Sequence, residues 1–123
     1  MNKLTYSLTF LTVLFYTIGQ STLKKGVDQA ALCCQKDSLL DYVWNVLTNP
    51  FVLCGLPICW TGTMIYLYIL GRTDLSVVNT VIIGGNCLAT AFMGHFLFGE
   101  VLSPLRFLGM GLIIIGVIFV SRA

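Results

Sequence analysis

The chain has 123 residues, of which 57% are hydrophobic and only 10% are charged, and its mean hydropathy is +0.90. This composition excludes an ordinary water-soluble domain, which carries about a quarter of its residues as charges. The seven lysines and arginines are dispersed, so they make no nucleic-acid-binding surface. We therefore expect the chain to act in or across a lipid bilayer.

Four apolar windows are each close to the roughly 20 residues that a helix needs to span the hydrocarbon core. The sequence predicts an all-α fold in which residues 1–123 form one integral membrane domain, a bundle of four transmembrane helices that assembles as a dimer. The first window is expected to be a retained helix rather than a cleaved signal, because Lys24 and Lys25 follow it directly. The four windows are residues 4–23, 51–70, 77–98 and 104–120.

A polar loop is expected at residues 24–49, the only long connection in the chain. Within it, residues 38–48 alternate apolar and polar residues with helical periodicity, and they include Tyr42 and Trp44. Aromatic rings of this kind favour the headgroup zone, so we expect a short helix at the membrane surface. Cys33 and Cys34 lie in the same loop and are candidates for oxidation or acylation.

The basic residues are divided almost equally between the two sides of the predicted bundle. This near-tie gives the chain little reason to choose one orientation and favours insertion both ways, as an antiparallel dimer. A single orientation, set by the lysines of the long loop, is the alternative. One side carries Lys3, Arg72 and Arg122, and the other carries Lys24, Lys25, Lys36 and Arg106.

Small residues mark the last predicted helix as a candidate contact between subunits. Gly109 and Gly116 are seven residues apart and share one helix face. Small residues let membrane helices approach closely, so these two glycines are predicted to contact a second subunit. Packing within one subunit would explain them equally well.

Polar side chains inside the apolar windows are the best pointers to function, because hydrocarbon makes them costly unless they meet water, a substrate or each other. On the third window, Asn79 and Asn86 share a face. We predict that Tyr16, Gln20, Asn79 and Asn86 bind a substrate, although Asn86 could instead bond only to a neighbouring helix. On the first window, a polar stripe comprises Thr5, Thr9, Thr12, Tyr16 and Gln20.

The remaining ionisable candidates are His95 and Glu100, which lie near the end of the third window. They could relay a proton or hold the turn that follows. No Asp, Glu, Lys or Arg occupies the middle of any window, so the usual device for proton coupling, a central carboxylate, is missing. No arrangement of nucleophile, base and oxyanion donors and no metal-ligand pattern is visible, so we expect neither an enzyme nor a cofactor or metal.

Residues 98–104, Phe-Gly-Glu-Val-Leu-Ser-Pro, followed by the glycine-spaced stretch 109–117, resemble the EamA-like drug/metabolite transporter superfamily in its four-helix form. The resemblance is nearest to the paired small subunits that flip aminoarabinose-phosphoundecaprenol, through Gly19-Gln20, Asn86 and the Glu100 turn. It is more distant to the small multidrug resistance branch, in which a glutamate of the first helix binds protons and drugs. Tyr16 stands at that glutamate position here.

This resemblance implies a small transporter or flippase of the bacterial inner membrane. Its substrate would be a lipid-linked sugar or another amphipathic metabolite, moved by alternating access in a homodimer or with a paired homologous subunit. Proton-coupled drug export is one alternative function. Another is a non-transporting membrane subunit that docks a partner through the surface helix around Trp44.

Overall fold

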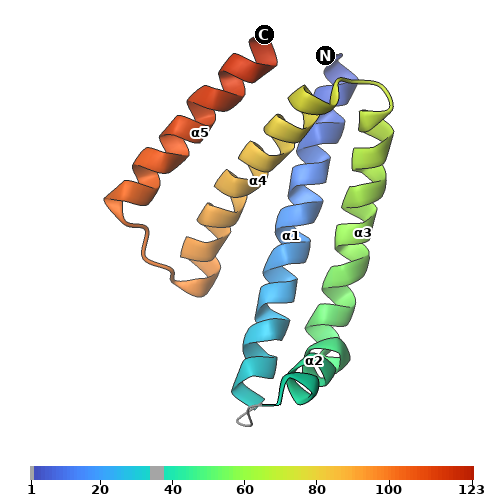
Figure 1. The fold of residues 1–123 in the computed structure, drawn as a ribbon, viewed down its shortest axis with the longest axis vertical. Helices are drawn as coiled ribbons and strands as arrows, with labels where there is room; N and C mark the ends of the chain where they lie inside the picture. The colour runs from blue at the N-terminus through green and yellow to red at the C-terminus, as the bar shows by residue number, and fades with distance from the viewer. Residues whose placement is uncertain (1, 34–37) are drawn as a thin grey trace.

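The computed structural model describes residues 2–33 and 38–123, and this part of the chain forms five α-helices joined by short connections (Figure 1). The all-α prediction is confirmed. The described ends of the chain lie at the same end of the molecule, because the long helices alternate in direction (Figure 1). The helices are α1 (Lys3–Cys33), α2 (Leu39–Thr48), α3 (Pro50–Leu70), α4 (Leu75–Phe98) and α5 (Pro104–Arg122).

Two of the long helices begin at the same sequence signal, a polar cap followed by proline. The Asn49 side chain accepts a hydrogen bond from the backbone N–H of Phe51 at 3.0 Å, and Pro50 opens α3. Ser103 and Pro104 start α5 in the same way. A proline fits the first turn because that turn has no use for its missing N–H. These signals separate α2 from α3 and α4 from α5.

Helix α1 is longer than the first apolar window, which corrects the predicted loop at residues 24–49. The helix runs through Lys24 and Lys25 to Cys33, and the surface helix occupies Leu39–Thr48. Hydropathy falls where the chain would leave the bilayer, but the helix continues because Gly26 and Ala30 are buried. The side chain of Cys33, and Cys34 and Lys36, lie outside the described residues.

Glycines at the contact between α1 and α3 let the two helices approach closely. A methyl group added at Gly19 would lie 2.4 Å from the sulfur of Cys59 and 3.3 Å from the carbonyl oxygen of Gly55. One at Gly26 would lie 2.6 Å from the Val52 side chain. Small residues at both ends of this contact let two helices pack along their length, as membrane helices do.

Helix α5 lies at the edge of the fold (Figure 1). Of the helices in the described part of the chain, it packs only against α4, and it has no buried residue of its own. The close approach there is made by Gly84 of α4, where an added methyl group would lie 2.4 Å from Val117. Apart from their chain neighbours and the backbone of their own helix, no atom of the described residues lies within 4 Å of a methyl group added at Gly109 or Gly116. Their contact with a second subunit stays a prediction.

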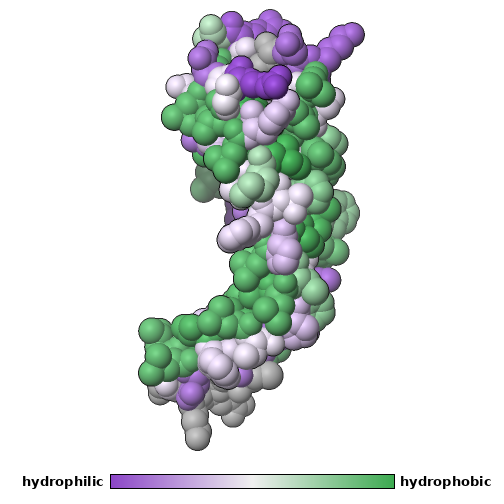
Figure 2. Space-filling model, turned by 90° about the vertical axis from the view of Figure 1, so that its right-hand side faces the viewer, coloured by the Kyte–Doolittle hydropathy of each residue, from purple (hydrophilic) through white to green (hydrophobic). Residues whose placement is uncertain are grey.

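Within the described residues, three helices are long and apolar enough to cross a membrane, namely α3, α4 and α5. This is consistent with an integral membrane protein. Hydrophobic residues cover most of the face drawn in Figure 2, and hydrophilic residues gather at the end that carries the α3–α4 connection. Helix α1 is not among the three, because its threonines and Gln20 lower its hydropathy.

The contact between α1 and α3 is testable at Gly19. Gly19→Ala should lower the free energy of unfolding in detergent by about 1 to 3 kcal/mol, because backbone atoms crowd the added methyl group and cannot move aside cheaply. Gly111→Ala is the control, since nothing lies within 4 Å of its added methyl group. Equal unfolding midpoints for the two variants would contradict the close packing.

Candidate functional site

A cavity between α1 and α4 is lined by all four residues that the sequence singled out for substrate binding. Its volume is about 250 Å³, and Tyr66 of α3 completes its polar lining. The side chains come from three helices, so only the tertiary structure brings them together. The full lining is Tyr16, Gln20, Tyr66, Asn79, Ile82, Ile83 and Asn86.

Asn86 is the centre of the hydrogen-bond network between α1 and α4. Its amide nitrogen donates to the side-chain oxygen of Gln20 at 3.3 Å. Its side-chain oxygen lies 3.3 Å from the hydroxyl of Thr17, which also donates to the carbonyl of Val13 at 2.8 Å. The single Thr17 proton is therefore shared, and the bond to Asn86 is the longer and weaker one.

Tyr16 links the cavity to α3. Its hydroxyl lies 3.2 Å from the hydroxyl of Thr63, which itself donates to the carbonyl of Cys59 at 3.0 Å. Because the Thr63 proton is already committed, Tyr16 is the donor in this pair. The bond fixes the ring at the wall of the cavity, where the resemblance had placed Tyr16 in the position of a glutamate.

Two side-chain amides of the cavity have N–H groups that donate no hydrogen bond to any described residue. The nitrogen of the Gln20 side chain has no hydrogen-bond partner in the described part of the chain, and Asn79 has none through either of its side-chain atoms. Both side chains are exposed at the protein surface. An amide within a membrane protein needs water, a ligand or another chain, so these two groups are available to bind one.

The rest of the polar stripe on α1 has a structural role. Thr9 and Thr12 are buried, and each donates to the carbonyl four residues earlier, at 2.8 and 2.9 Å. Only Tyr16 and Gln20 of the stripe line the cavity. Thr17, which touches Asn86, was missed because it lies outside the stripe's spacing.

A second cavity, of about 370 Å³, continues along the same two helices and shares Gln20 with the first. Lys24 and Glu100 form an ion pair at its wall, and the Lys24 ammonium lies 4.5 Å from the centre of the Phe98 ring. Lys24 was not among the residues predicted to bind a substrate. The full lining of the second cavity is Gln20, Ser21, Lys24, Cys87, Thr90, Ala91, Gly94, Phe98 and Glu100.

Glu100 belongs to the turn between α4 and α5. Gly99 adopts the left-handed conformation, with φ of 64°, and the Glu100 backbone N–H donates to the Gly94 carbonyl at 3.1 Å. Nδ1 of His95 lies 2.9 Å from the Glu100 carbonyl and not at its carboxylate. This contact joins His95 to the backbone of the turn. A role of His95 and Glu100 in proton transfer stays a prediction.

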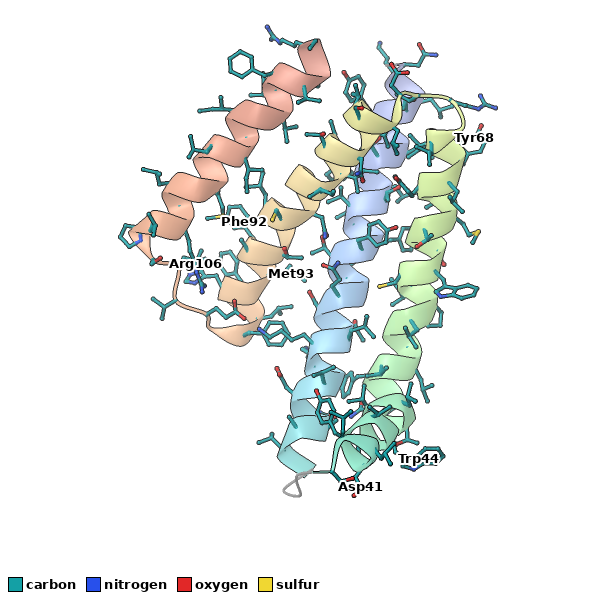
Figure 3. The ribbon with its side chains drawn as sticks, in the orientation of Figure 1. Asp41, Trp44, Tyr68, Phe92, Met93 and Arg106 are labelled. Atoms are coloured by element: carbon teal, nitrogen blue, oxygen red, sulfur yellow. The ribbon has the colours of Figure 1, made fainter. Side chains whose placement is uncertain are left out.

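The charge of Glu100 is stabilised by its neighbours. The hydrogen bond and the attraction of Lys24 hold the pKa of this carboxyl below its ordinary value of 4.5, and the more distant Arg106 acts in the same direction. Arg106 lies beside the same turn (Figure 3). The turn therefore brings one carboxylate near two cations, of which Lys24 is its ion-pair partner.

No group of three histidine, cysteine or carboxylate side chains that could hold a metal ion is found among residues 2–33 and 38–123. Comparisons of the chain with protein-family models, with curated proteins and with solved structures found no match.

The ion pair makes stability depend on acid pH. A carboxyl with a lowered pKa in the folded state contributes stability above pH 4.5, and that contribution is lost as the pH falls below this value. We expect Glu100→Gln and Lys24→Gln each to flatten the acid side of the wild-type profile of unfolding midpoint against pH in detergent. Lys25→Gln is the matched control and should retain the slope; three identical profiles would contradict the prediction.

Proposed function

We propose that the chain is a small membrane transporter of the drug/metabolite type, in which α1 is the fourth membrane-spanning helix. It would move a lipid-linked sugar or another amphipathic metabolite across a bacterial inner membrane by alternating access. The observation that carries the proposal is the cavity of Tyr16, Gln20, Asn79 and Asn86 inside an otherwise apolar helical body. The head group would bind there while the tail stays in the bilayer.

The packing of α1 supports its role as a fourth span. Its 31 residues extend over about 46 Å, more than the roughly 30 Å of the hydrocarbon core. It lies between α3 and α4, two helices apolar enough to cross a membrane (Figure 1). These neighbours shield its polar face, and most of its hydroxyls bond to its own backbone, which lowers the cost of placing them in lipid.

The two sides of α1 differ in a way that suits alternating access. On the α3 side, glycines allow close contact, as at Gly19 and Cys59. On the α4 side, Val78 and Ile82 pack against α1, but a long hydrogen bond and cavities lie between the two helices at Asn86 and Gln20. We infer that α1 with α3 forms one unit and α4 with α5 the other, and that the polar contact between them breaks and re-forms as the units rock.

A second subunit would complete the site. Asn79 presents an unpaired amide beside the groove between α4 and α5, where Gly116 and Val117 line a further cavity of about 400 Å³. Because α5 contacts only α4, the outer face of this pair is open to another copy of the chain or to a homologous subunit. An antiparallel dimer would place two such faces against each other.

One alternative function has an observation in its favour. Helix α2 has no buried residue, and Trp44 points away from the helical body, with 69% of its surface exposed (Figure 3). A non-transporting subunit could dock a partner enzyme there. The exposed Trp44 ring is also of the kind that favours the headgroup zone of a bilayer. Proton-coupled drug export has less support, because Glu100, the carboxylate that lines the second cavity, is already paired with Lys24.

The fourth span can be tested by locating both ends of the chain. If α1 crosses the membrane with α3, α4 and α5, reporters fused before Met1 and after Ala123 lie on the same side; if only three helices cross, they lie on opposite sides. We expect the same side in every molecule, measured with dual reporters of compartment in cells. A mixture of inward and outward pairs would support antiparallel assembly, and a single orientation would oppose it.

The transport function can be tested in liposomes with a prenyl-phosphate sugar that carries a fluorescent group on its sugar. Exposure of the probe to a membrane-impermeant quencher measures its movement. We expect Asn86→Ala and Gln20→Ala to slow movement about tenfold or more, because each removes a hydrogen-bonding amide that lines the cavity.

Tyr42→Ala and Trp44→Ala serve as controls and should retain the wild-type rate if the cavity carries the function. If wild-type protein moves no probe while Trp44→Ala abolishes capture of a crosslinked partner in cells, the docking function replaces the proposal. Unfolding midpoints of all variants separate loss of function from loss of fold.

A further inference from the structure

The second cavity brings a lysine to the inner wall of the proposed transport path. Lys24 lies four residues after Gln20 on α1, so both side chains are on the same helix face, one turn apart. Gln20 lines both cavities, and Lys24 lines the second. A head group held at the amides of the first cavity therefore lies beside the Lys24 ammonium.

The charges of this region are not balanced. Lys24 pairs with Glu100, and Arg106 lines a neighbouring cavity together with the same Glu100, whose pKa its charge also lowers. Arg106 otherwise donates only to the Val101 carbonyl, at 3.4 Å. These two cations and one carboxylate give the region a local net charge of +1, so it can accept one more negative charge.

Lys24 and Gln20 are the side chains of the second cavity that can donate hydrogen bonds to a ligand, because the other polar side chains there already use their protons. The hydroxyl protons of Ser21 and Thr90 are donated to backbone carbonyls, at 2.8 and 2.7 Å. Their oxygens can therefore only accept. The Gln20 side-chain nitrogen, which has no partner among the described residues, and the Lys24 ammonium remain to bind an acceptor-rich group.

We propose that Lys24 binds the phosphate of a lipid head group, and that Glu100 is the internal anion which this phosphate displaces from Lys24. On displacement, the Glu100 carboxylate turns to Arg106, so no charge is left unpaired. The inference rests on the proposed transport function and adds the charge class of its substrate.

The position of Glu100 makes the exchange inexpensive. Both side chains of the ion pair are about two-fifths exposed, at 42% and 41%, so a ligand can reach them. The Glu100 backbone is held by the turn at Gly94 and His95, and only its carboxylate has to move. A pair that served only to join α1 to the turn would need neither the cavity nor the second cation.

The test is binding of radiolabelled dodecyl phosphate to immobilised protein in dodecyl maltoside, whose uncharged head group provides the background. Lys24→Gln should weaken binding about tenfold, because it removes a charge-assisted contact. Glu100→Gln should strengthen binding, because it removes the competing anion. Lys25→Gln is the matched control, with the same change of net charge on the neighbouring residue, and should bind as the wild type does.

Two outcomes overturn the anion site: equal loss of binding in Lys24→Gln and Lys25→Gln, which would indicate general electrostatic attraction, or weaker binding in Glu100→Gln. Lys24→Arg keeps the cation and should retain binding, which covers the case in which Lys24→Gln does not fold. Unlabelled dodecyl phosphate should compete at far lower concentration than inorganic phosphate; equal competition would assign the site to free phosphate and overturn the lipid head group.

The site and the transport function can fail separately. If the wild-type protein binds dodecyl phosphate with the expected pattern of variants but moves no probe in liposomes, the transport function falls and the anion site stands. If the protein moves the prenyl-phosphate sugar and Lys24→Gln moves it as fast, the anion site falls and the transport function stands.

Discussion

Close contact between α1 and α3 is the constraint on which the other features depend. Gly19 and Gly26 allow the backbones to approach, and no side chain larger than hydrogen fits at either position without a shift of its neighbours. This contact fixes the rotation of α1, and the rotation decides which of its polar residues turn toward α4. Tyr16 is bonded to α3 and lines the first cavity, Lys24 lines the second, and Gln20 lines both.

The interface between α1 and α4, here called the seam, is held together by different interactions. Beside the cavities, the hydrogen bonds of Thr17, Asn86 and Gln20 are long, shared or incomplete. Elsewhere between the two helices, Val78 and Ile82 of α4 belong to the apolar core. Weak polar contacts in a low-dielectric setting are costly to leave unsatisfied but easy to exchange for equivalent ones. Such a seam suits a surface that opens to a polar head group and closes again, which is the property that the proposed transport function requires.

Sequence reasoning located the candidate site because polar residues stand out in apolar windows. Asn79, Asn86, Tyr16 and Gln20 were each visible in this way, and all four line one cavity. Thr9 and Thr12 share the polar stripe of Tyr16 and Gln20, but their hydroxyls bond within their own helix, and Lys24 was not among the residues predicted to bind a substrate. A lysine after an apolar window is indistinguishable from an ordinary flanking charge until its partner, Glu100, is placed beside it by contacts distant in sequence.

By itself, the sequence determined the helical character of the chain, its affinity for a bilayer and the starts of α3 and α5, because composition, periodicity and Asn-Pro or Ser-Pro caps act locally. Only the tertiary structure decided how far α1 extends, since burial of Gly26 and Ala30 and not hydropathy continues the helix. It also decided which polar groups meet. Helix rotation and the left-handed turn at Gly99 bring Glu100 to Lys24, and no local rule encodes a contact between residues so far apart in the chain.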